Sequence, residues 1–387
     1  MDVEKLIRPE LTTMEGYTPI EPVEVLGQRT QLPPEGIVKL DGNENPYGCS
    51  PKVYEALAAY SRYHIYPDPE QRDLREALET YVGMSRQYIL CGSGSDELID
   101  LVLRLFLEPG DEIINCPPTF GMYPFSANVC GGKVIDVPRI DGSFALDLSG
   151  IKGAVNSKTK VIFIASPNNP TANTVREQEI MQLLDTGRIV VVDEAYFEFS
   201  GATVASLTPN HPNLIVLRTF SKWAGLAGLR IGYGVFPVEI VNHLMRIKQP
   251  YNINTAAQIA VLASLADIDY LRDNVARIVA ERRRLFGRLK ELGWLRLYPS
   301  RANFILCCLR HHSDTSPFGI ASEADQSDAA QDKVGEESHA KRIWRQLQEK
   351  GIFVRYFDSP RLADCLRISV GKPEDTDVLI EALKDVC

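Results

Sequence analysis

The fold is decided by the stretch from residue 160 to residue 222, which contains KVIFIASPNNPT (160–171), RIVVVDEAY (188–196) and NLIVLRTFSK (213–222). Each segment is a short apolar run that ends abruptly in polar residues. Runs that are apolar on both faces are typical of buried, mainly parallel strands. The intervening residues are helical in pattern, so the stretch predicts an α/β fold with three layers.

Similar apolar runs lie upstream, at YILC (88–91) and EIINC (112–116), and the alternation with helical patterns continues to about residue 235. A chain of 387 residues is compatible with two or three domains. We therefore assign residues 51–285 to a large α/β/α domain that is built on a mainly parallel sheet.

A smaller α+β domain is expected over residues 286–387, where the strand patterns NFILCCL (303–309) and GIFVRYF (351–357) alternate with two helical patterns. Residues 239–292 are mostly helical by period, and their charged stretch ERRRLFGRLKELG predicts an exposed helix that links the two domains. Residues 1–50 are rich in proline and turn residues, and we expect an extended arm that packs against the small domain.

The segment 310–340 departs from this organisation. It has few large apolar residues and seven acidic ones. Low hydrophobicity combined with charge predicts a flexible or loosely packed insertion in the small domain.

Composition narrows the functional classes. The net charge of −9 argues against binding to nucleic acid or to anionic membrane surfaces. No apolar run approaches the ~20 residues that span a bilayer, and the N-terminus lacks the features of a signal peptide, so a cytoplasmic location is expected. The eight cysteines show neither C-x-x-C nor zinc-finger spacing, which predicts reduced thiols and no metal site.

Polar side chains follow the three strand ends of the deciding stretch. Asn168 and Asn169 follow the first strand, Asp193 ends the second, and Ser221 and Lys222 follow the third. Ligands of open α/β sheets bind beyond the carboxyl ends of the strands, so these groups should face one crevice. Singly, a surface lysine, a helix-capping aspartate or an asparagine turn would be ordinary, but their coincidence at three strand ends is poorly explained that way.

This set suits pyridoxal 5'-phosphate. A lysine amine forms a Schiff base with an aldehyde cofactor, and Lys222 is the candidate for this catalytic role. The cofactor withdraws electrons only while its ring nitrogen is protonated, which a buried carboxylate such as Asp193 ensures. Asn169 and Tyr196 are candidate donors to the phenolate oxygen, and Phe120 could stack on the ring.

A second motif offers a cradle for the cofactor phosphate. LCGSGSDELIDLVLRLF (90–106) predicts a strand, a Gly-Ser turn and a helix whose first N–H groups would bind an anion. A dinucleotide fingerprint is the rival interpretation, but Glu97 stands where that motif needs its third small residue. The candidate phosphate ligands are Gly94, Ser95, Asp96, Thr219, Ser221 and Arg230.

The segments SPNNPT, DEAYFEF and FSKWAGLAGLRIGY resemble those of fold type I pyridoxal-phosphate-dependent aminotransferases. With KLDGNENPYG (39–48), IYPDPE (65–70), CPPTFGMY (116–123) and CLRISVG (365–371), the sequence is more closely similar to the histidinol-phosphate aminotransferase family. The similarity spans nearly the whole chain except residues 310–340.

The resemblance implies transamination between L-glutamate and imidazole acetol phosphate, giving 2-oxoglutarate and L-histidinol phosphate in histidine biosynthesis. It also implies a homodimer in which the N-terminal arm packs on the partner subunit. Tyr66 would then reach the cofactor phosphate bound by the partner subunit.

Both substrates are anions, which arginine binds well. Arg355 and Arg367 are the candidates, on adjacent C-terminal strands, and Arg367 matches the carboxylate-binding arginine that the resemblance implies. Tyr17 in the arm and Asn43 in NENPYG are further candidates for substrate binding. One departure from the family pattern is Ala172, where a glycine is usual.

Three alternatives share parts of this pattern. An aromatic amino acid aminotransferase would use the same core, and a threonine-phosphate decarboxylase would share the fold and the phosphate-binding arginines but release CO₂. A cofactor-sensing regulator would need a DNA-binding segment, and the first 50 or so residues show no helix-turn-helix pattern or basic cluster.

Overall fold

The computed structural model describes residues 1–310 and 337–386, so most of the insertion predicted at 310–340 lies outside the described residues. Its larger sheet has seven strands in the order β2-β8-β7-β6-β5-β3-β4. The strands are β2 (Ile89–Gly92), β3 (Glu112–Asn115), β4 (Lys133–Asp136), β5 (Thr159–Ala165), β6 (Ile189–Asp193), β7 (Leu214–Thr219) and β8 (Gly232–Val235). Only β8 runs antiparallel to its neighbours, so the sheet is mainly parallel, as predicted.

Two strands of this sheet were missed by the sequence pattern, and both have a physical reason. β4 lies at the sheet edge and its ends, Lys133 and Asp136, are exposed, so it lacks the continuous apolar run of a buried strand. β8 reads GYGV, and glycine is depleted in strands. The other five strands match their predicted segments to within about one residue.

The three-layer arrangement follows from alternation along the strands. In β5, Ile162 and Ile164 belong to one apolar cluster, whereas Val161 and Phe163 belong to another. Successive side chains of a strand point to opposite faces, so a separate core forms on each side of the sheet. This confirms the predicted α/β/α architecture.

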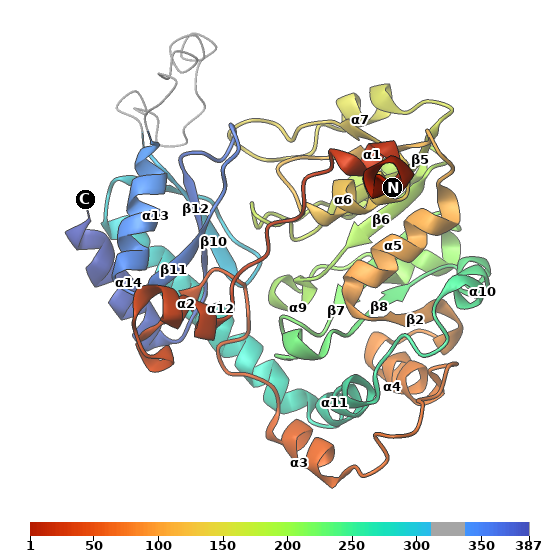
Figure 1. Cartoon of the computed structure of the whole chain (residues 1–387), viewed down its shortest axis with the longest axis horizontal. Helices are drawn as coiled ribbons and strands as arrows, with labels where there is room; N and C mark the ends of the chain where they lie inside the picture. Colours follow the sequence, from red (N-terminus) through yellow and green to blue (C-terminus); the bar gives the residue numbers. More distant parts are fainter. Residues whose placement is uncertain (311–336, 387) are drawn as a thin grey trace.

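Helices supply the outer layers of both cores (Figure 1). They are α3 (Pro51–Ala59), α4 (Arg72–Val82), α5 (Gly94–Phe106), α6 (Met122–Val129), α7 (Leu148–Ala154), α8 (Glu177–Leu184), α9 (Phe197–Ser200), α10 (Val238–Ile247) and α11 (Thr255–Leu265). Ser50 caps the start of α3, where its hydroxyl accepts a hydrogen bond from the N–H of Lys52 and Pro51 occupies the first helical position.

The smaller sheet has five strands in the order β1-β11-β12-β10-β9. They are β1 (Val38–Leu40), β9 (Leu295–Leu297), β10 (Phe304–Leu309), β11 (Ile352–Tyr356) and β12 (Cys365–Ser369), accompanied by helices α13 (His339–Glu349) and α14 (Pro373–Asp385). β1 comes from the N-terminal segment and pairs in parallel with β11.

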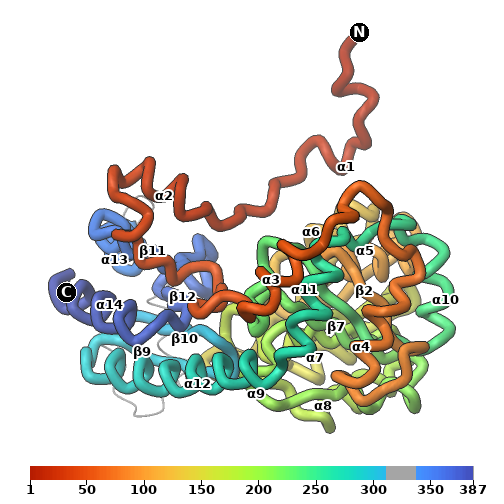
Figure 2. The backbone as a smooth tube through the Cα atoms, turned by 90° about the horizontal axis from the view of Figure 1, so that it is seen from below, coloured from red at the N-terminus to blue at the C-terminus, as the bar shows by residue number. Residues whose placement is uncertain are grey.

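The N-terminal segment is more structured than the expected arm. Besides β1 it contains α1 (Pro9–Thr12) and the eight-residue helix α2 (Val23–Thr30), which the proline-rich composition hid. Figure 2 shows the residues before α2 projecting from the body of the chain, as an arm does. How the chain divides into domains stays a prediction.

The long helix α12 (Ile268–Glu291) runs from the large-sheet part of the chain to the small-sheet part in both views (Figures 1 and 2). It was expected to be exposed, but Leu271, Ile278, Leu285 and Leu289 form a buried stripe along it. Their spacing of seven, seven and four residues fits one helix face, which the charged residues between them obscured.

The prediction of reduced thiols throughout is wrong for one pair. Cys308 on β10 and Cys365 on β12 form a disulfide. The register of this antiparallel strand pair places the two residues opposite one another, which their separation of 57 residues along the chain could not reveal. Within residues 1–310 and 337–386, no helix is both long and apolar enough to cross a bilayer.

Candidate active site

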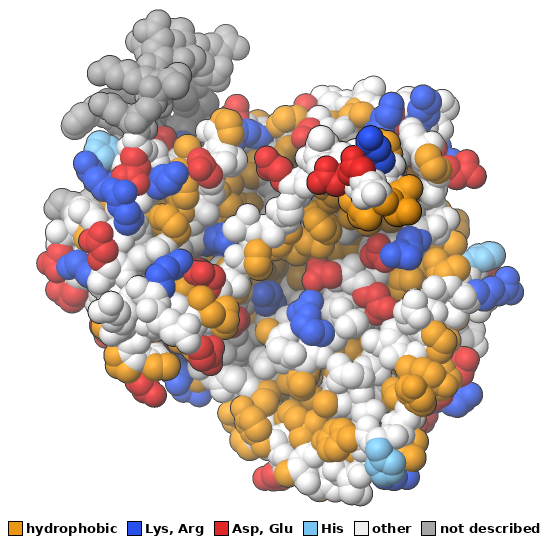
Figure 3. All heavy atoms as spheres, in the orientation of Figure 1, with side chains coloured by type: hydrophobic (Ala, Val, Ile, Leu, Met, Phe, Trp, Pro, Cys, Tyr) orange, Lys and Arg blue, Asp and Glu red, His pale blue; other side chains and the backbone are white. Residues whose placement is uncertain are grey.

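A cavity of about 530 Å³ lies between residues of the two sheets, at the carboxyl ends of the parallel strands. A hollow with charged side chains along it is visible between the two halves of the molecule in Figure 3. The sequence-predicted residues that line the cavity are Tyr17, Asn43, Ser95, Asp96, Phe120, Asn169, Asp193, Tyr196, Thr219, Ser221, Lys222, Arg230, Arg355 and Arg367. Gly94 lies beside it, and Tyr66 does not line it.

Lys222 extends into this cavity from the loop after β7. Its Nζ donates a hydrogen bond of 2.9 Å to the carbonyl oxygen of Gly42, which is 180 residues away in sequence. Desolvation, together with the positive charge of Arg367, lowers the pKa of Lys222 to about 8. The neutral amine, which is the nucleophilic form, is therefore far more populated near physiological pH than in an ordinary lysine.

Asp193, the last residue of β6, is buried and lies on the cavity wall. Its Oδ2 accepts a 2.7 Å hydrogen bond from the hydroxyl of Tyr123, and its Oδ1 accepts one of 3.0 Å from the N–H of Ala195. Burial raises the pKa of Asp193 to about 6, although both hydrogen bonds oppose this. The carboxylate is thus mostly charged at neutral pH, and none of the described Lys or Arg side chains pairs with it, so it suits a cationic ligand group.

Tyr123 is a site residue that the sequence reasoning missed. It begins α6 with Met122, is fully buried, and stacks on Phe163 of β5 with ring centroids 4.7 Å apart. It lies in the quoted motif CPPTFGMY, but nothing in that motif revealed that its hydroxyl would meet Asp193. Phe120, which was predicted to stack on the cofactor, lies edge-on to Tyr123 at 5.6 Å.

Asn169 and Tyr196 are held from the small-sheet side of the cavity. Arg367 donates a 2.6 Å hydrogen bond to the amide oxygen of Asn169, which leaves the amide nitrogen of Asn169 to serve another acceptor. The amide of Asn43 donates to the Tyr196 hydroxyl at 3.0 Å. Both predicted phenolate donors are therefore oriented by predicted substrate-binding residues.

Asn43 is itself fixed by the small sheet. Its backbone N–H and its amide oxygen both bond to the hydroxyl of Ser369, and its carbonyl accepts from Asn303. The residue has φ of 54°, a left-handed conformation that asparagine tolerates better than most residues do.

The predicted phosphate cradle forms where α5 begins. Gly94 has φ of 78°, a left-handed conformation that favours glycine, and a Cβ atom there would lie 2.7 Å from Nη2 of Arg230, so the backbone approaches this guanidinium closely. Arg230 pairs with the Asp96 carboxylate at 2.9 Å. Thr219 and Ser221, whose hydroxyls are 2.9 Å apart, line the same end of the cavity. The first N–H groups of α5 have no partner within the helix, as an anion site requires.

Glu97, which excluded the dinucleotide fingerprint, has a local role in this turn. Its carboxylate accepts hydrogen bonds from the N–H of Ser93 and from the amide of Asn252. It therefore supports the turn that precedes the cradle.

Arg355 and Arg367 face each other across β11 and β12, where the register pairs them directly. The prediction that they lie on adjacent strands is confirmed. Arg367 is buried and donates to Asn169 and to the carbonyl oxygen of Asp41, but none of the described carboxylates forms an ion pair with it. Two like charges placed opposite one another repel, so the pair favours an anion between them.

Comparisons with known proteins place the chain in a family. The model of the class I and II aminotransferases matches residues 35–383. A histidinol-phosphate aminotransferase from Dehalococcoides mccartyi is 46% identical over 385 residues, covering 100% of this chain and 99% of the relative. The chain belongs to the histidinol-phosphate aminotransferase family.

Other members of the histidinol-phosphate aminotransferase family are similar over nearly their whole length. The Roseiflexus castenholzii protein is 47% identical, covering 98% of both chains. The solved histidinol-phosphate aminotransferase from Sinorhizobium meliloti, in complex with pyridoxal-5'-phosphate, has a TM-score of 0.83 and 27% identity, covering 98% of this chain and 97% of that one. The chain therefore has the fold type I architecture.

Two further positions singled out in the sequence lie outside the cavity lining. Ala172, which replaces the usual glycine, has φ of 61° and is fully buried, so it carries left-handed strain in the turn that holds Asn169. Tyr66 is 77% exposed and stacks on Tyr251 with ring centroids 4.4 Å apart. Its role toward a partner subunit stays a prediction.

Proposed function

We propose that this chain is a pyridoxal-phosphate-dependent aminotransferase that transfers the amino group of L-glutamate to imidazole acetol phosphate, producing L-histidinol phosphate and 2-oxoglutarate. One observation carries the proposal: Asn169, Asp193 and Lys222, from three separate strand ends, line one cavity that two facing arginines close on the other side. Membership of the histidinol-phosphate aminotransferase family supports the substrate assignment.

The residues present fit pyridoxal phosphate. Asp193 is a buried carboxylate for the ring nitrogen, and the glycine turn at Gly94 with Arg230 beside it suits the phosphate. Tyr196 and Asn169 would donate to the phenolate oxygen, and Lys222 would form the covalent link. When bound, the cofactor supplies an electron sink for charge that develops on the substrate carbon.

Lys222 has two further tasks in this reaction. Once the substrate amine has replaced it, its Nζ is free to take the proton from the substrate Cα as a general base. It would then donate that proton, as a general acid, to the carbon at which the proton transfer ends. The pKa of about 8 is close to the operating pH, which suits both directions. The carbonyl of Gly42 holds the amine in reach between these events.

Arg355 and Arg367 bind the anionic ends of both substrates in turn. A carboxylate of glutamate and the phosphate of the second substrate each present oxygens that match the guanidinium fork. Because the substrates occupy the site one after the other, the reaction is ping-pong. Tyr17, whose ring lies 6.3 Å from that of Phe120, covers the cavity from the arm.

We infer that the enzyme is a cytoplasmic homodimer. Tyr66 and Tyr251 form a stacked, exposed aromatic pair that does not line their own cavity. Aromatic residues are enriched at protein interfaces, which supports a contact there with the partner subunit.

A panel of keto acceptors with L-glutamate as donor tests the function. Imidazole acetol phosphate should give the highest kcat/KM, above aromatic keto acids. Higher activity with phenylpyruvate would favour the aromatic aminotransferase instead. Release of CO₂ from threonine phosphate, without amino transfer, would identify a decarboxylase.

A further inference from the structure

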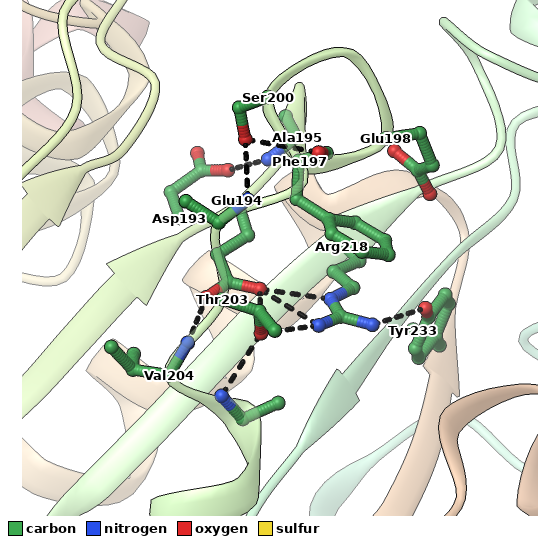
Figure 4. A network of polar contacts seen from close by, with 12 residues as sticks. Asp193, Glu194, Ala195, Phe197, Glu198, Ser200, Thr203, Val204, Arg218 and Tyr233 are labelled. Carbon is green, nitrogen blue, oxygen red and sulfur yellow. Dashed lines mark hydrogen bonds and ion pairs between the residues drawn. The ribbon is translucent and has the colours of Figure 1, made fainter. Parts of the chain in front are cut away.

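Behind the cavity wall lies a second group of buried charges, shown in Figure 4. Glu194 follows Asp193 directly, and Arg218 precedes Thr219 and lies four residues before Lys222. Both side chains are almost fully buried, with 2% of Glu194 and 5% of Arg218 exposed. Neither lines the cavity.

The carboxylate of Glu194 is fully hydrogen-bonded. Its Oε1 accepts from the N–H of Val204 at 2.7 Å. Its Oε2 accepts from the Thr203 hydroxyl at 2.8 Å and from Nε and Nη2 of Arg218 at 3.0 and 2.9 Å. The rotamer of Glu194 is therefore determined by three separate groups.

Arg218 is equally constrained. The face of its guanidinium lies 3.6 Å from the ring centroid of Phe197, and its Nη2 donates to the Thr203 hydroxyl at 2.6 Å. Its Nη1 donates to the hydroxyl of Tyr233 at 3.2 Å. This contact crosses to β8, where Tyr233 is the register partner of Arg218.

The pair therefore joins three adjacent strands, β6, β7 and β8, at the end of the sheet that faces the cavity. The N–H of Glu194 donates to the carbonyl of Leu217 on β7, so backbone and side chain of the same residue both fasten β6 to β7. Asp193 and the loop that bears Lys222 enter the cavity from this same end of the sheet. Any lateral shift between β6 and β7 would change the distance between the carboxylate and the amine.

The charges of the group are balanced by this one ion pair. Glu198, also near Arg218, contacts the hydroxyl of Tyr81, and burial raises the pKa of Glu198 to about 8. It is therefore mostly uncharged at neutral pH, whereas the Glu194 carboxylate lies 2.9 Å from Nη2 of Arg218 and forms the ion pair with it. Buried ion pairs rarely stabilise a fold more than well-packed apolar residues do, so a role in geometry explains this pair better than one in stability.

We propose that Arg218 and Glu194 are positioning residues, which hold Asp193 and Lys222 at the separation that the two ends of the bound cofactor require. This inference rests on the proposed function, because it needs Asp193 at the ring nitrogen and Lys222 at the aldehyde carbon. The pair acts by holding β6 and β7 in register with each other, and it touches neither cofactor nor substrate.

The test compares three variants with the wild-type enzyme. Arg218→Met with Glu194→Gln removes both charges but keeps similar volumes and an acceptor for Val204. Tyr233→Phe removes only the hydroxyl that bonds to Arg218, and is expected to fold in any case. Leu347→Ala, at a buried position of α13 that does not line the cavity, is the control for general loss of stability.

Three quantities are measured: the unfolding midpoint of the cofactor-free protein, the dissociation constant of pyridoxal phosphate, and the pH midpoint of the visible absorbance of the bound cofactor. In the double variant the dissociation constant should rise by about tenfold or more, and the pH midpoint should shift. Tyr233→Phe should change both in the same direction by a smaller factor. Leu347→Ala should lower the unfolding midpoint and leave both cofactor properties unchanged.

The proposal is overturned if Tyr233→Phe, and the double variant where it folds, keep the wild-type dissociation constant and pH midpoint. It is also overturned if Leu347→Ala alters them as much as the double variant does. Failure of the wild-type protein to bind pyridoxal phosphate or to transaminate would instead contradict the proposed function.

Discussion

Arg218 lies in β7 and Lys222 lies four residues later, in the loop that follows this strand. Both side chains are cations, but their neighbours differ in kind. Arg218 has a carboxylate, two hydroxyls and an aromatic ring as neighbours. Among the described residues, Lys222 has the carbonyl oxygen of Gly42 as its one hydrogen-bond acceptor, and Arg367 is a like-charged neighbour. Burial therefore leaves one cation fully charged and makes the other easy to deprotonate.

The difference between the two cations distinguishes two uses of buried charge: Arg218 serves structure, and Lys222 serves chemistry. Asp193 and Glu194 repeat it for anions: Glu194 is paired with Arg218, whereas the donors to Asp193 in the described part of the chain are neutral, the Tyr123 hydroxyl and the N–H of Ala195. A buried charge without a counter-charge is unfavourable in the free protein, and such sites are where ligands of opposite charge or covalent chemistry are expected. The predictions below test the chemical side of this comparison.

The largest effect is expected from Lys222→Ala. The covalent link and the proton-transfer group are both lost, so turnover should fall by at least about 10²–10⁴-fold. Turnover and visible absorbance of the cofactor-loaded protein are the measurements. Lys160→Ala, which removes a partly exposed lysine paired with Asp111, is the matched control and should behave as wild type. A Lys222→Ala protein that stays coloured and active would contradict the chemical role assigned to Lys222.

Replacement of Asp193 by asparagine keeps the shape and removes the charge. Because the ring nitrogen then loses its anionic partner, kcat should fall by about 10²–10³-fold, the range seen when one preorganised electrostatic group is deleted. Cofactor binding should weaken as well, which equilibrium dialysis measures. A wild-type kcat in Asp193→Asn would mean that the buried carboxylate is structural, like Glu194.

The desolvation of Lys222 beside Arg367 predicts a pH dependence. Because its pKa is lowered to about 8, the neutral amine is the minor form at pH 7 and the major form at pH 9. Recombination of cofactor-free protein with pyridoxal phosphate should therefore accelerate by about tenfold between pH 7 and a plateau above pH 9. Stopped-flow absorbance follows the reaction. A rate that still rises steeply beyond pH 10 would show that Lys222 titrates as an ordinary lysine.

Tyr123→Phe sharpens the comparison at Asp193 by removing one of its two neutral donors. Loss of the 2.7 Å hydrogen bond should raise the pKa of Asp193 further above its value of about 6. More of the carboxyl is then protonated at pH 7, so cofactor affinity should fall several-fold at pH 6.5–7 and recover toward pH 8.5. An effect that is independent of pH would point to packing of the ring instead.

The smallest effect is expected from Ala172→Gly, which restores the residue usual in the family. Relief of left-handed strain is worth about 1–2 kcal/mol. The lost buried methyl group and the greater freedom of glycine in the unfolded chain oppose it by about 0.8 and 0.5–1 kcal/mol. The free energy of unfolding should change by less than about 1 kcal/mol in urea titration. A change above about 2 kcal/mol of either sign would show that one of these effects is misjudged.

Much of the large sheet and of the cavity could be predicted because both depend on local patterns. The strands that lead to Asn169, Asp193 and Lys222 are continuous apolar runs, and the carboxyl ends of parallel strands meet at one edge. Once these strands were identified, the convergence of an amide, a carboxylate and an amine followed from topology.

The rest depends on contacts that no local pattern encodes. The bond from Lys222 to Gly42 joins residues 180 positions apart, and the bond from Tyr123 to Asp193 depends on the stacking of the Tyr123 ring on Phe163 of β5. Likewise, the Cys308–Cys365 disulfide depends on strand register. The pairing of Glu194 with Arg218 was also missed. Glu194 directly follows Asp193 and Arg218 directly precedes Thr219, and these neighbouring motif residues are the more conspicuous ones.

The parallel pairing of β1 with β11 has a practical consequence for engineering. Residues 38–40 complete a sheet whose other strands all lie beyond residue 294. A C-terminal fragment expressed alone would leave one side of β11 with unsatisfied backbone groups, and such edges recruit foreign strands and aggregate. Chimaeras that exchange the C-terminal part between relatives should therefore carry the matching N-terminal strand with it.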